Sequence, residues 1–288
     1  MLRNKKIAWI VFGVLFGVSI AVWLIIWDLR EAGDLEVVFF DVGQGDAIFV
    51  ETKYGFQVLI DGGPDLTILD KLGKEMPFYD RTLDLIVLTH PDHDHLFGLL
   101  EVLKRYEVKN ILWTGVEKDT AEWQEWKKLI KEEGANIIIA KAGQRINFSA
   151  QGIFLDILYP FESLEGREFK YANDTSIVAE LVFKNISVLF TGDISKKTEK
   201  ELIDKYIDLK SDILKIAHHG SASSSCEEFL EKISPELAVI SVGENSWGHP
   251  DKRVLANLEK FDIKVLITKE LGDIKIISDG QKYQFSNF

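Results

Sequence analysis

The chain has 288 residues, of which 46% are hydrophobic and 28% are charged, and its formal net charge is -12 at pH 7. This composition is typical of a packed globular protein rather than a disordered one, and its acidic balance argues against strong attraction to polyanions. The single cysteine, Cys226, excludes an internal disulfide framework and any cysteine-rich zinc site.

The amino-terminal segment 7–27 is apolar and has 21 residues without a charged side chain. That length suits a helix that crosses a hydrocarbon core of roughly 30 Å. Arg3, Lys5 and Lys6 precede it, so the positive-inside rule predicts a single-pass protein of the cytoplasmic membrane with its catalytic domain on the extracytoplasmic side. A cleaved signal peptide is the alternative, but its apolar region is usually shorter, about 7–15 residues. We expect residues 1–34 to form a membrane anchor and short linker.

Beyond residue 34, segments with strand and helix patterns alternate along the chain. We expect strands at 35–40, 47–51, 56–60, 85–88, 111–113, 136–140, 153–158, 176–183, 186–190, 213–217, 237–242 and 264–268. We expect helices at 96–106, 120–133, 195–206, 227–233 and 253–261, and a loop with a short helix at 65–83. The alternation predicts an α/β fold, and two β-rich halves with helices between them suggest a four-layer αββα sandwich over residues 35–288.

Six histidines are the first sign of a functional site, because none lies inside a predicted helix or strand. Each follows a predicted strand or lies in a turn beside glycine or proline, where α/β folds place their ligand-binding and catalytic groups. A structural histidine usually stands alone on a half-buried face. The six are His90, His93, His95, His218, His219 and His249.

The densest cluster is His90-Pro-Asp-His-Asp-His95, which follows the apolar strand predicted at 85–88. Imidazoles and carboxylates are ligands that suit Zn, Mn or Fe. Two aspartates this close are costly unless a cation neutralises them. A solvated polar loop is the alternative, but the abrupt change from a wholly apolar strand favours a metal site.

Other polar clusters also flank predicted strands. Asp193 follows the strand at 186–190, where it could bind a metal or cap the next helix. His218 and His219 follow the strand at 213–217, although adjacent histidines can also form a solvated loop. The segments 173–176 and 245–250 contain Asn173, Ser176 and His249 and could be ordinary turns.

Together these residues show that the chain resembles the metallo-β-lactamase superfamily, and within it the hydrolase domain of ComEC-type DNA-uptake proteins. The resemblance extends from about residue 35 to residue 267. Its motifs occur in order as Asp41-Val-Gly-Gln-Gly-Asp46-Ala, Leu59-Ile-Asp-Gly-Gly63, Thr89-His-Pro-Asp-His-Asp-His95, Asn173-Asp-Thr-Ser-Ile-Val178, Leu189-Phe-Thr-Gly-Asp193, Lys215-Ile-Ala-His-His-Gly-Ser221, and Ser241-Val-Gly with Gly248-His-Pro250.

The resemblance implies a centre for two divalent ions, Zn²⁺ or Mn²⁺. In the signature H-x-H-x-D-H, Asp92 takes the second histidine position, as in the ComEC-like subgroup, and His93 is a spacer. The superfamily usually has a further histidine between His95 and His218, and this chain has none, so Asn173 or Asp174 is expected near that gap. The sequence leaves open whether His218 or His219 binds metal, and His218 is preferred because it directly follows the strand. The implied ligands are His90, Asp92, Asp94, His95, Asp193 and His218.

The resemblance also suggests roles for other polar residues. Asp94 is expected to bind metal and to orient the water that metal ions activate. Asp46 and Asp61 are expected to shape turns or to orient the ligands. Further candidate catalytic groups are His219, Asn173, Ser176 and His249, and candidate substrate-binding groups are Asp174 and Ser221.

The function implied by the resemblance is a metal-dependent phosphodiesterase or nuclease. Nucleic acid would be its substrate and a separate DNA-uptake channel its partner, because one predicted membrane helix cannot form a channel. The net charge of -12 opposes tight binding of nucleic acid unless metals or a local basic patch offset it. The alternative is a hydrolase of another ester, such as a phosphocholine-type ester, a lactone or a β-lactam. A non-catalytic membrane-tethered binding protein is a third interpretation, disfavoured by the His and Asp set.

Overall fold

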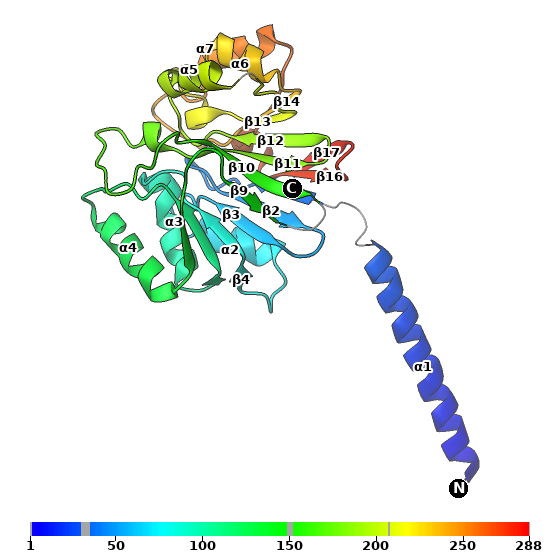
Figure 1. Cartoon of the computed structure of the whole chain (residues 1–288). Coiled ribbons are helices and arrows are strands. Elements are labelled where there is room, and N and C mark those ends of the chain that lie inside the picture. The colour runs from blue at the N-terminus through cyan, green and yellow to red at the C-terminus, as the bar shows by residue number, and fades with distance from the viewer. Residues whose placement is uncertain (1, 30–34, 149–151, 207, 288) are drawn as a thin grey trace.

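The computed structural model describes residues 2–29, 35–148, 152–206 and 208–287, and two sheets dominate it (Figure 1). The first sheet has eight strands in the order β17-β16-β1-β2-β3-β5-β7-β8. Strands β3, β5, β7 and β8 run parallel, and the other pairs are antiparallel. The bounds are β1 Leu35–Phe39, β2 Ile48–Thr52, β3 Gln57–Ile60, β5 Leu85–Val87, β7 Asn110–Trp113, β8 Asn136–Ile139, β16 Ile274–Ser278 and β17 Tyr283–Asn287.

The second sheet has seven strands in the order β15-β14-β13-β12-β11-β10-β9. Strands β12 to β15 run parallel, whereas β9 to β12 form an antiparallel meander. The bounds are β9 Arg145–Asn147, β10 Ile153–Tyr159, β11 Val178–Phe183, β12 Ile186–Phe190, β13 Ile213–Lys215, β14 Leu237–Ile240 and β15 Lys264–Ile267. A separate two-stranded sheet pairs β4 (Thr82–Leu83) with β6 (Glu107–Val108).

Helices cover the outer face of each sheet, so the predicted αββα sandwich is the observed architecture (Figure 1). One apolar cluster fills the space between the sheets. A second cluster lies between the first sheet and its helices, and a third lies between the second sheet and its helices. The first sheet is covered by α2 Thr67–Glu75, α3 His93–Leu103 and α4 Ala121–Glu133, and the second by α5 Lys196–Lys205, α6 Glu227–Ile233 and α7 Lys252–Lys260. The short helices are η2 Asn173–Thr175, η3 Ala217–Gly220 and α8 Thr268–Leu271.

Local sequence explains where the helices beside the site begin. In α4, the Thr120 hydroxyl accepts a hydrogen bond from Trp123 N at 3.2 Å, and Gly134 ends the helix with a φ of 72°. Asp92 precedes α3 as its N-cap residue but makes no side-chain capping bond. The Asp92 carboxylate is therefore available for other partners.

The amino-terminal helix α1 (Leu2–Leu29) stands apart from the sandwich in Figure 1. A membrane span needs about 20 consecutive, predominantly apolar residues. Among the residues that the structure describes, no helix meets the requirements of length and apolar character for crossing a membrane. This finding contradicts the predicted membrane-spanning anchor and the predicted single-pass localisation. The linker predicted at residues 30–34 lies outside the described residues.

Both halves of the sandwich contribute the ends of parallel strands to one edge. Strands β3 and β5 end at Ile60 and Val87, and strands β12 and β13 end at Phe190 and Lys215. The polar motifs of the sequence follow directly after these four strands. Parallel strands of an α/β fold bind ligands beyond their carboxyl ends, which is where these motifs lie.

Candidate metal centre

Asp61 directly follows β3 and connects the residues that the first sheet and α3 contribute to the site. It is fully buried, and its carboxylate accepts hydrogen bonds from Thr89 N at 2.8 Å and Thr89 Oγ1 at 2.6 Å. Its Oδ2 also lies 2.8 Å from Nδ1 of His95, in the first turn of α3. A neutral ring that donates from Nδ1 leaves an unprotonated Nε2, the usual arrangement of a metal-binding histidine. Asp61 thus makes a contact of the kind expected for a residue that orients a ligand.

The loop that carries Asp46 packs closely against the start of α3. Asp46 N donates to the Asp94 carbonyl at 3.2 Å, and Gly45 has a φ of 146°. A Cβ atom at Gly45 would collide with the same carbonyl oxygen, so this close approach requires glycine. The Asp46 side chain is buried beside His95, with Oδ2 at 3.8 Å from Nδ1 of that ring.

The second half of the site comes from the ends of β12 and β13. Asp193 is buried, and its backbone N–H donates to Ser176 Oγ at 3.0 Å. His219 is also buried, and its Nδ1 lies 2.9 Å from the Ser241 carbonyl oxygen. Its Nε2 therefore faces the first half of the site, at 3.3 Å from Asp94 Oδ2.

The two halves meet at Asp193. Its Oδ2 lies 3.5 Å from Nε2 of His95 and 3.4 Å from Nε2 of His219. Across the described residues, Nε2 of His90, His95 and His219 has no hydrogen-bond partner, although each ring is buried. Buried polar atoms without partners are costly, and a divalent ion would satisfy them. The groups close enough to hold one are His90-His95-Asp193, Asp94-His95-His219, Asp46-Asp61-His95 and Asp46-Asp193-His219.

The site is a cluster of opposing charges. Burial opposes the charged form of Asp193, but His219 and His95 outweigh it and hold the pKa of Asp193 well below its usual range. Burial likewise opposes the charged form of His219, but the Asp193 charge and its hydrogen bond raise the pKa of His219 to about 10. The same carboxylate raises the pKa of His95 against the effect of burial. The carboxylates thus require positive charge nearby, which protons on the rings or bound cations can supply.

Asp92 and His93 point in different directions from the start of α3. Asp92 Oδ2 lies 3.6 Å from Nε2 of His90, and its Oδ1 accepts a hydrogen bond from Lys118 at 2.5 Å. His93 is exposed, and its Nδ1 lies 2.8 Å from Glu122 on α4. His93 therefore faces away from the cluster, as expected for a spacer. Sequence reasoning did not find Lys118, because it lies in a loop with no metal-site motif.

The structure reverses the expected positions of His218 and His219. Nε2 of His218 lies 3.4 Å from Asn173 Nδ2, and its Nδ1 lies 3.2 Å from Ser223 Oγ. His218 belongs to none of the metal-compatible groups found among the described residues, whereas His219 belongs to two. Both residues have left-handed backbones, with φ of 52° and 54°, so the sharp turn after β13 directs the second ring inwards. Proximity to the strand is thus a poor guide to which ring faces the cluster.

The other predicted site residues lie around the cluster. Asp174 Oδ1 accepts a hydrogen bond from Ser195 Oγ at 2.6 Å, so this side chain faces the start of α5. Ser221 Oγ lies 2.9 Å from Ser223 Oγ. The His249 ring lies beside that of His218, with ring centroids 5.7 Å apart.

Lys215 is a residue whose role sequence reasoning missed. Only 1% of it is exposed, and its ammonium group pairs with Asp46 and donates to the Gly192 carbonyl at 3.0 Å. A charged residue inside the apolar run 213–217 was the signal that could have found it.

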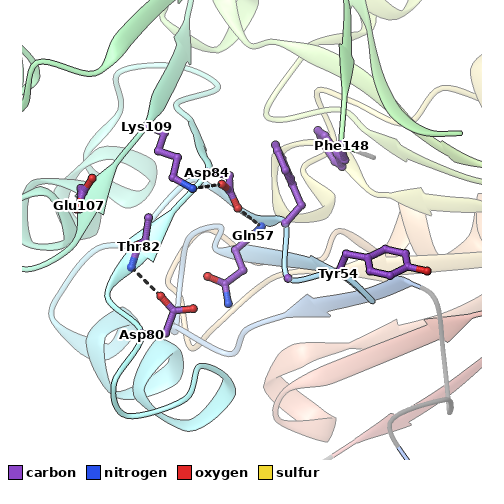
Figure 2. Close-up of a pocket in the computed structure, with 10 residues that line it drawn as sticks. Tyr54, Gln57, Asp80, Thr82, Asp84, Glu107, Lys109 and Phe148 are labelled. Carbon is purple, nitrogen blue, oxygen red and sulfur yellow. Dashed lines mark hydrogen bonds and ion pairs between the residues drawn. The ribbon is translucent and has the colours of Figure 1, made fainter. Parts of the chain in front are cut away.

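A pocket of about 660 Å³ is separate from the cluster. Figure 2 shows its lining side chains, among which Gln57, Asp84 and Lys109 lie at the starts of β3, β5 and β7. Asp84 pairs there with Lys109 at 2.7 Å and accepts from Gln57 N at 2.9 Å. These two charged side chains thus pair with each other, and none of the residues that line the pocket belongs to the histidine cluster.

A comparison with known families decides the assignment. The sequence model of the Metallo-beta-lactamase superfamily matches residues 40–244. The chain belongs to the metallo-beta-lactamase superfamily. The matched range contains Asp46, His90 and His219, which belong to the cluster described above. Its buried His and Asp set fits the divalent ions that this fold binds.

Curated relatives identify the branch of the metallo-beta-lactamase superfamily. The chain is 31% identical over 268 residues to ComE operon protein 3 of Bacillus subtilis, an alignment that covers 86% of this chain and 33% of that protein. It is 30% identical over 245 residues to competence protein ComA of Neisseria gonorrhoeae, covering 83% and 32%. The chain thus spans about a third of the length of these relatives. It is a metallo-beta-lactamase superfamily hydrolase related to competence proteins, which confirms the resemblance found in the sequence.

Solved structures support the fold of this metallo-beta-lactamase superfamily member. The metallo-beta-lactamase fold protein YhfI from Bacillus subtilis has a TM-score of 0.57 at 13% identity, covering 88% of this chain and 100% of that chain. Igni18, described as a metallo hydrolase from Ignicoccus hospitalis, has a TM-score of 0.53 at 18% identity, covering 88% and 99%. At these identities the likeness shows the fold alone.

Proposed function

We propose that this protein hydrolyses phosphodiester bonds, as a metal-dependent phosphodiesterase or nuclease. The observation that carries the proposal is the approach of the buried Nε2 atoms of His95 and His219 to Asp193. A third buried Nε2 atom without a partner among the described residues, that of His90, lies 3.6 Å from Asp92, and Asp94 lies 3.3 Å from His219. Oxygen-rich sets of this kind suit Mn²⁺ as well as Zn²⁺. The relatives named for competence favour a nucleic-acid substrate, and a separate DNA-uptake channel is the partner that we propose.

The proposed ligand set departs from the sequence-based one at a single histidine. His90 would hold one divalent ion with Asp92, which belongs to none of the metal-compatible groups among the described residues but whose Oδ2 lies 3.6 Å from Nε2 of His90. Asp94, His95 and His219 would hold the other ion. Asp193 would contact both ions, because it shares a metal-compatible group with His90 and its Oδ2 lies 3.4 Å from Nε2 of His219. Bound ions of this type lower the pKa of a coordinated water and stabilise the negative charge that develops on the reacting group.

The residues around the ions have separate tasks in this proposal. The second oxygen of the Asp94 carboxylate would orient the attacking water, since this side chain is only partly buried at the open side of the cluster. Burial lowers the pKa of His249, which favours its neutral ring. A neutral His249 could hydrogen-bond a substrate oxygen. Lys118 beside Asp92 would attract the phosphate to this side of the cluster.

Metal analysis combined with hydrolysis of bis-p-nitrophenyl phosphate tests the proposal. We expect Mn²⁺ or Zn²⁺ to copurify or to bind, and hydrolysis to require it. Asp94→Ala should abolish hydrolysis with an unchanged circular dichroism spectrum. His93→Ala is the matched control, because this exposed ring faces Glu122 instead of the cluster.

Substrate panels then separate the proposed activity from the alternatives. Single- and double-stranded DNA should be cut by the wild type and spared by Asp94→Ala. A wild type that stays metal-free and inert after addition of either ion would refute the proposal. Hydrolysis of a lactone, a β-lactam or a phosphocholine ester without phosphodiester cleavage would assign the same centre to another ester.

A further inference from the structure

Lys215 places a buried positive charge beside Asp46 and Asp193 of the proposed metal centre. It is the last residue of β13, and it is flanked in sequence by the buried Leu214 and Ile216. Its ammonium group pairs with Asp46 Oδ2, donates to the Gly192 carbonyl at 3.0 Å and lies 3.6 Å from Asp193 Oδ1. Burying an ammonium ion costs several kcal/mol unless such partners surround it. A buried lysine between apolar neighbours is therefore expected to have a role that an apolar side chain could not fill.

The histidine rings divide the cluster into two sides. On the outer side, Nε2 of His95 lies 3.5 Å and Nε2 of His219 lies 3.4 Å from Asp193. Nε2 of His90, His95 and His219 has no hydrogen-bond partner among the described residues. On the inner side, Nδ1 of His95 lies 3.8 Å and Nδ1 of His219 lies 3.6 Å from the Asp46 carboxylate. Metal-compatible groups occur on both sides, and the two that involve the inner side both contain Asp46.

The carboxylate that both inner groups share is the one that Lys215 contacts. Asp46 is buried, and it pairs through Oδ2 with the ammonium group. An ammonium ion on this oxygen supplies the charge that a metal would otherwise supply, and it occupies the space beside the carboxylate. Because the lysine is covalently attached to β13, it cannot be exchanged for an ion from solution.

We propose that Lys215 is a built-in cation that closes the inner side of the centre to metal. Divalent ions are thereby confined to the outer side, where the three Nε2 atoms and the open face of the site meet. Lys215 is a positioning residue in this proposal, since it acts through Asp46 and Asp193. The inference rests on the proposed metal centre but not on the identity of its substrate.

Metal stoichiometry measures the proposed exclusion directly. Wild type, Lys215→Met and Lys215→Arg would be loaded with Mn²⁺, desalted and analysed for bound ions per chain, with electron paramagnetic resonance spectra as a second readout. We expect Lys215→Met to bind one more ion than the wild type and to show a new Mn²⁺ signal. Lys215→Arg keeps the charge and should match the wild type. Combining Asp46→Asn with Lys215→Met should remove the gain, because the extra site loses its carboxylate.

A second variant keeps the proposal testable if Lys215→Met does not fold. Asp46→Asn leaves the ammonium group with Asp193 as its remaining carboxylate partner, where it would compete with metal. We expect this variant to bind Mn²⁺ about tenfold or more weakly by calorimetry, within the range found for residues that support metal ligands.

The outcomes distinguish this inference from the proposed function. A folded Lys215→Met with wild-type stoichiometry and spectrum, only less stable to heat, would overturn the inference and leave the hydrolase proposal intact. An unchanged Mn²⁺ affinity in Asp46→Asn would overturn it too. A wild type that binds no Mn²⁺ or Zn²⁺ would instead refute the proposed function on which the inference rests.

Discussion

Asp61 Oδ2 lies 2.8 Å from Nδ1 of His95, and this contact turns Nε2 of the same ring towards Asp193. Asp61 is itself fixed by two hydrogen bonds from Thr89, the residue before His90. The end of β3 therefore orients a ring on α3 through one buried carboxylate. Orientation of this kind strengthens a ligand without contact with the metal.

Asp61→Asn should weaken metal binding by about 10–100-fold, because the amide is a poorer acceptor for the Nδ1 proton of His95. Calorimetric titration with Mn²⁺ or Zn²⁺ measures the change. Asp70→Asn removes an exposed carboxylate on α2 and is the matched control. Equal affinities in both variants would mean that Asp61 serves the fold instead of the metal centre.

His219 and His218 offer a test by two adjacent residues of the same type. His219→Ala removes an Nε2 atom that lies within 3.4 Å of Asp193, so metal affinity should fall by at least about 100-fold. His218→Ala should keep the metal content and change hydrolysis less, because its ring contacts Asn173 and Ser223. Metal content and bis-p-nitrophenyl phosphate hydrolysis would be measured for both. A larger loss of metal in His218→Ala than in His219→Ala would instead identify His218 as the ligand.

Sequence reasoning located the site well because strand ends could be predicted. Asp61, His90 and Asp193 each follow an apolar run that forms a strand, and strands of an α/β fold present such residues along one edge. The carboxyl-terminal hairpin β16–β17 is absent from the predicted strands, although Ile274 and Ile276 alternate with other residues and Asp279-Gly280 is a turn signal.

The contacts within the site could not be predicted in the same way. Which of His218 and His219 faces inwards depends on two left-handed backbone conformations that residue type does not encode. Asp174 meets Ser195, and Lys118 meets Asp92, across 21 and 26 residues of sequence. Contacts this distant depend on the packing of whole elements, and their residue types are equally common in solvated turns.

The packing of α4 on the first sheet can be tested through Trp126. This side chain is fully buried and lies against Trp113 of β7, with ring centroids 6.2 Å apart. Trp126→Ala should lower the free energy of unfolding by about 3–5 kcal/mol, because a large cavity remains. Trp247 is 69% exposed, so Trp247→Ala should change it by no more than about 0.5 kcal/mol. Urea unfolding measures both, and a loss below 1 kcal/mol for Trp126→Ala would contradict this packing.

Glu180 on β11 gives the fold a pH dependence that is independent of the metal centre. Burial, together with the charges of Asp156, Asp208 and Asp212, raises the pKa of Glu180 to about 7. Asp156 lies opposite Glu180 on β10 and pairs with Arg145 of β9 at 2.6 Å. The folded chain therefore holds a proton on Glu180 at a pH where the unfolded chain, with a pKa near 4.5, has released it.

The sign of the effect follows from proton linkage. Between about pH 4.5 and 7 the folded state binds more protons at Glu180, so this group's contribution to stability is complete below pH 4.5 and is lost as pH rises through 7. Glu180→Gln removes the charge, so the variant should gain roughly 1–3 kcal/mol over the wild type at pH 8, after allowance for partial exposure. At pH 5 the two proteins should differ little. Urea unfolding at both values measures this, with Glu132→Gln on the exposed face of α4 as the control. A difference between Glu180→Gln and wild type that is the same at pH 5 and pH 8 would show that Glu180 titrates normally.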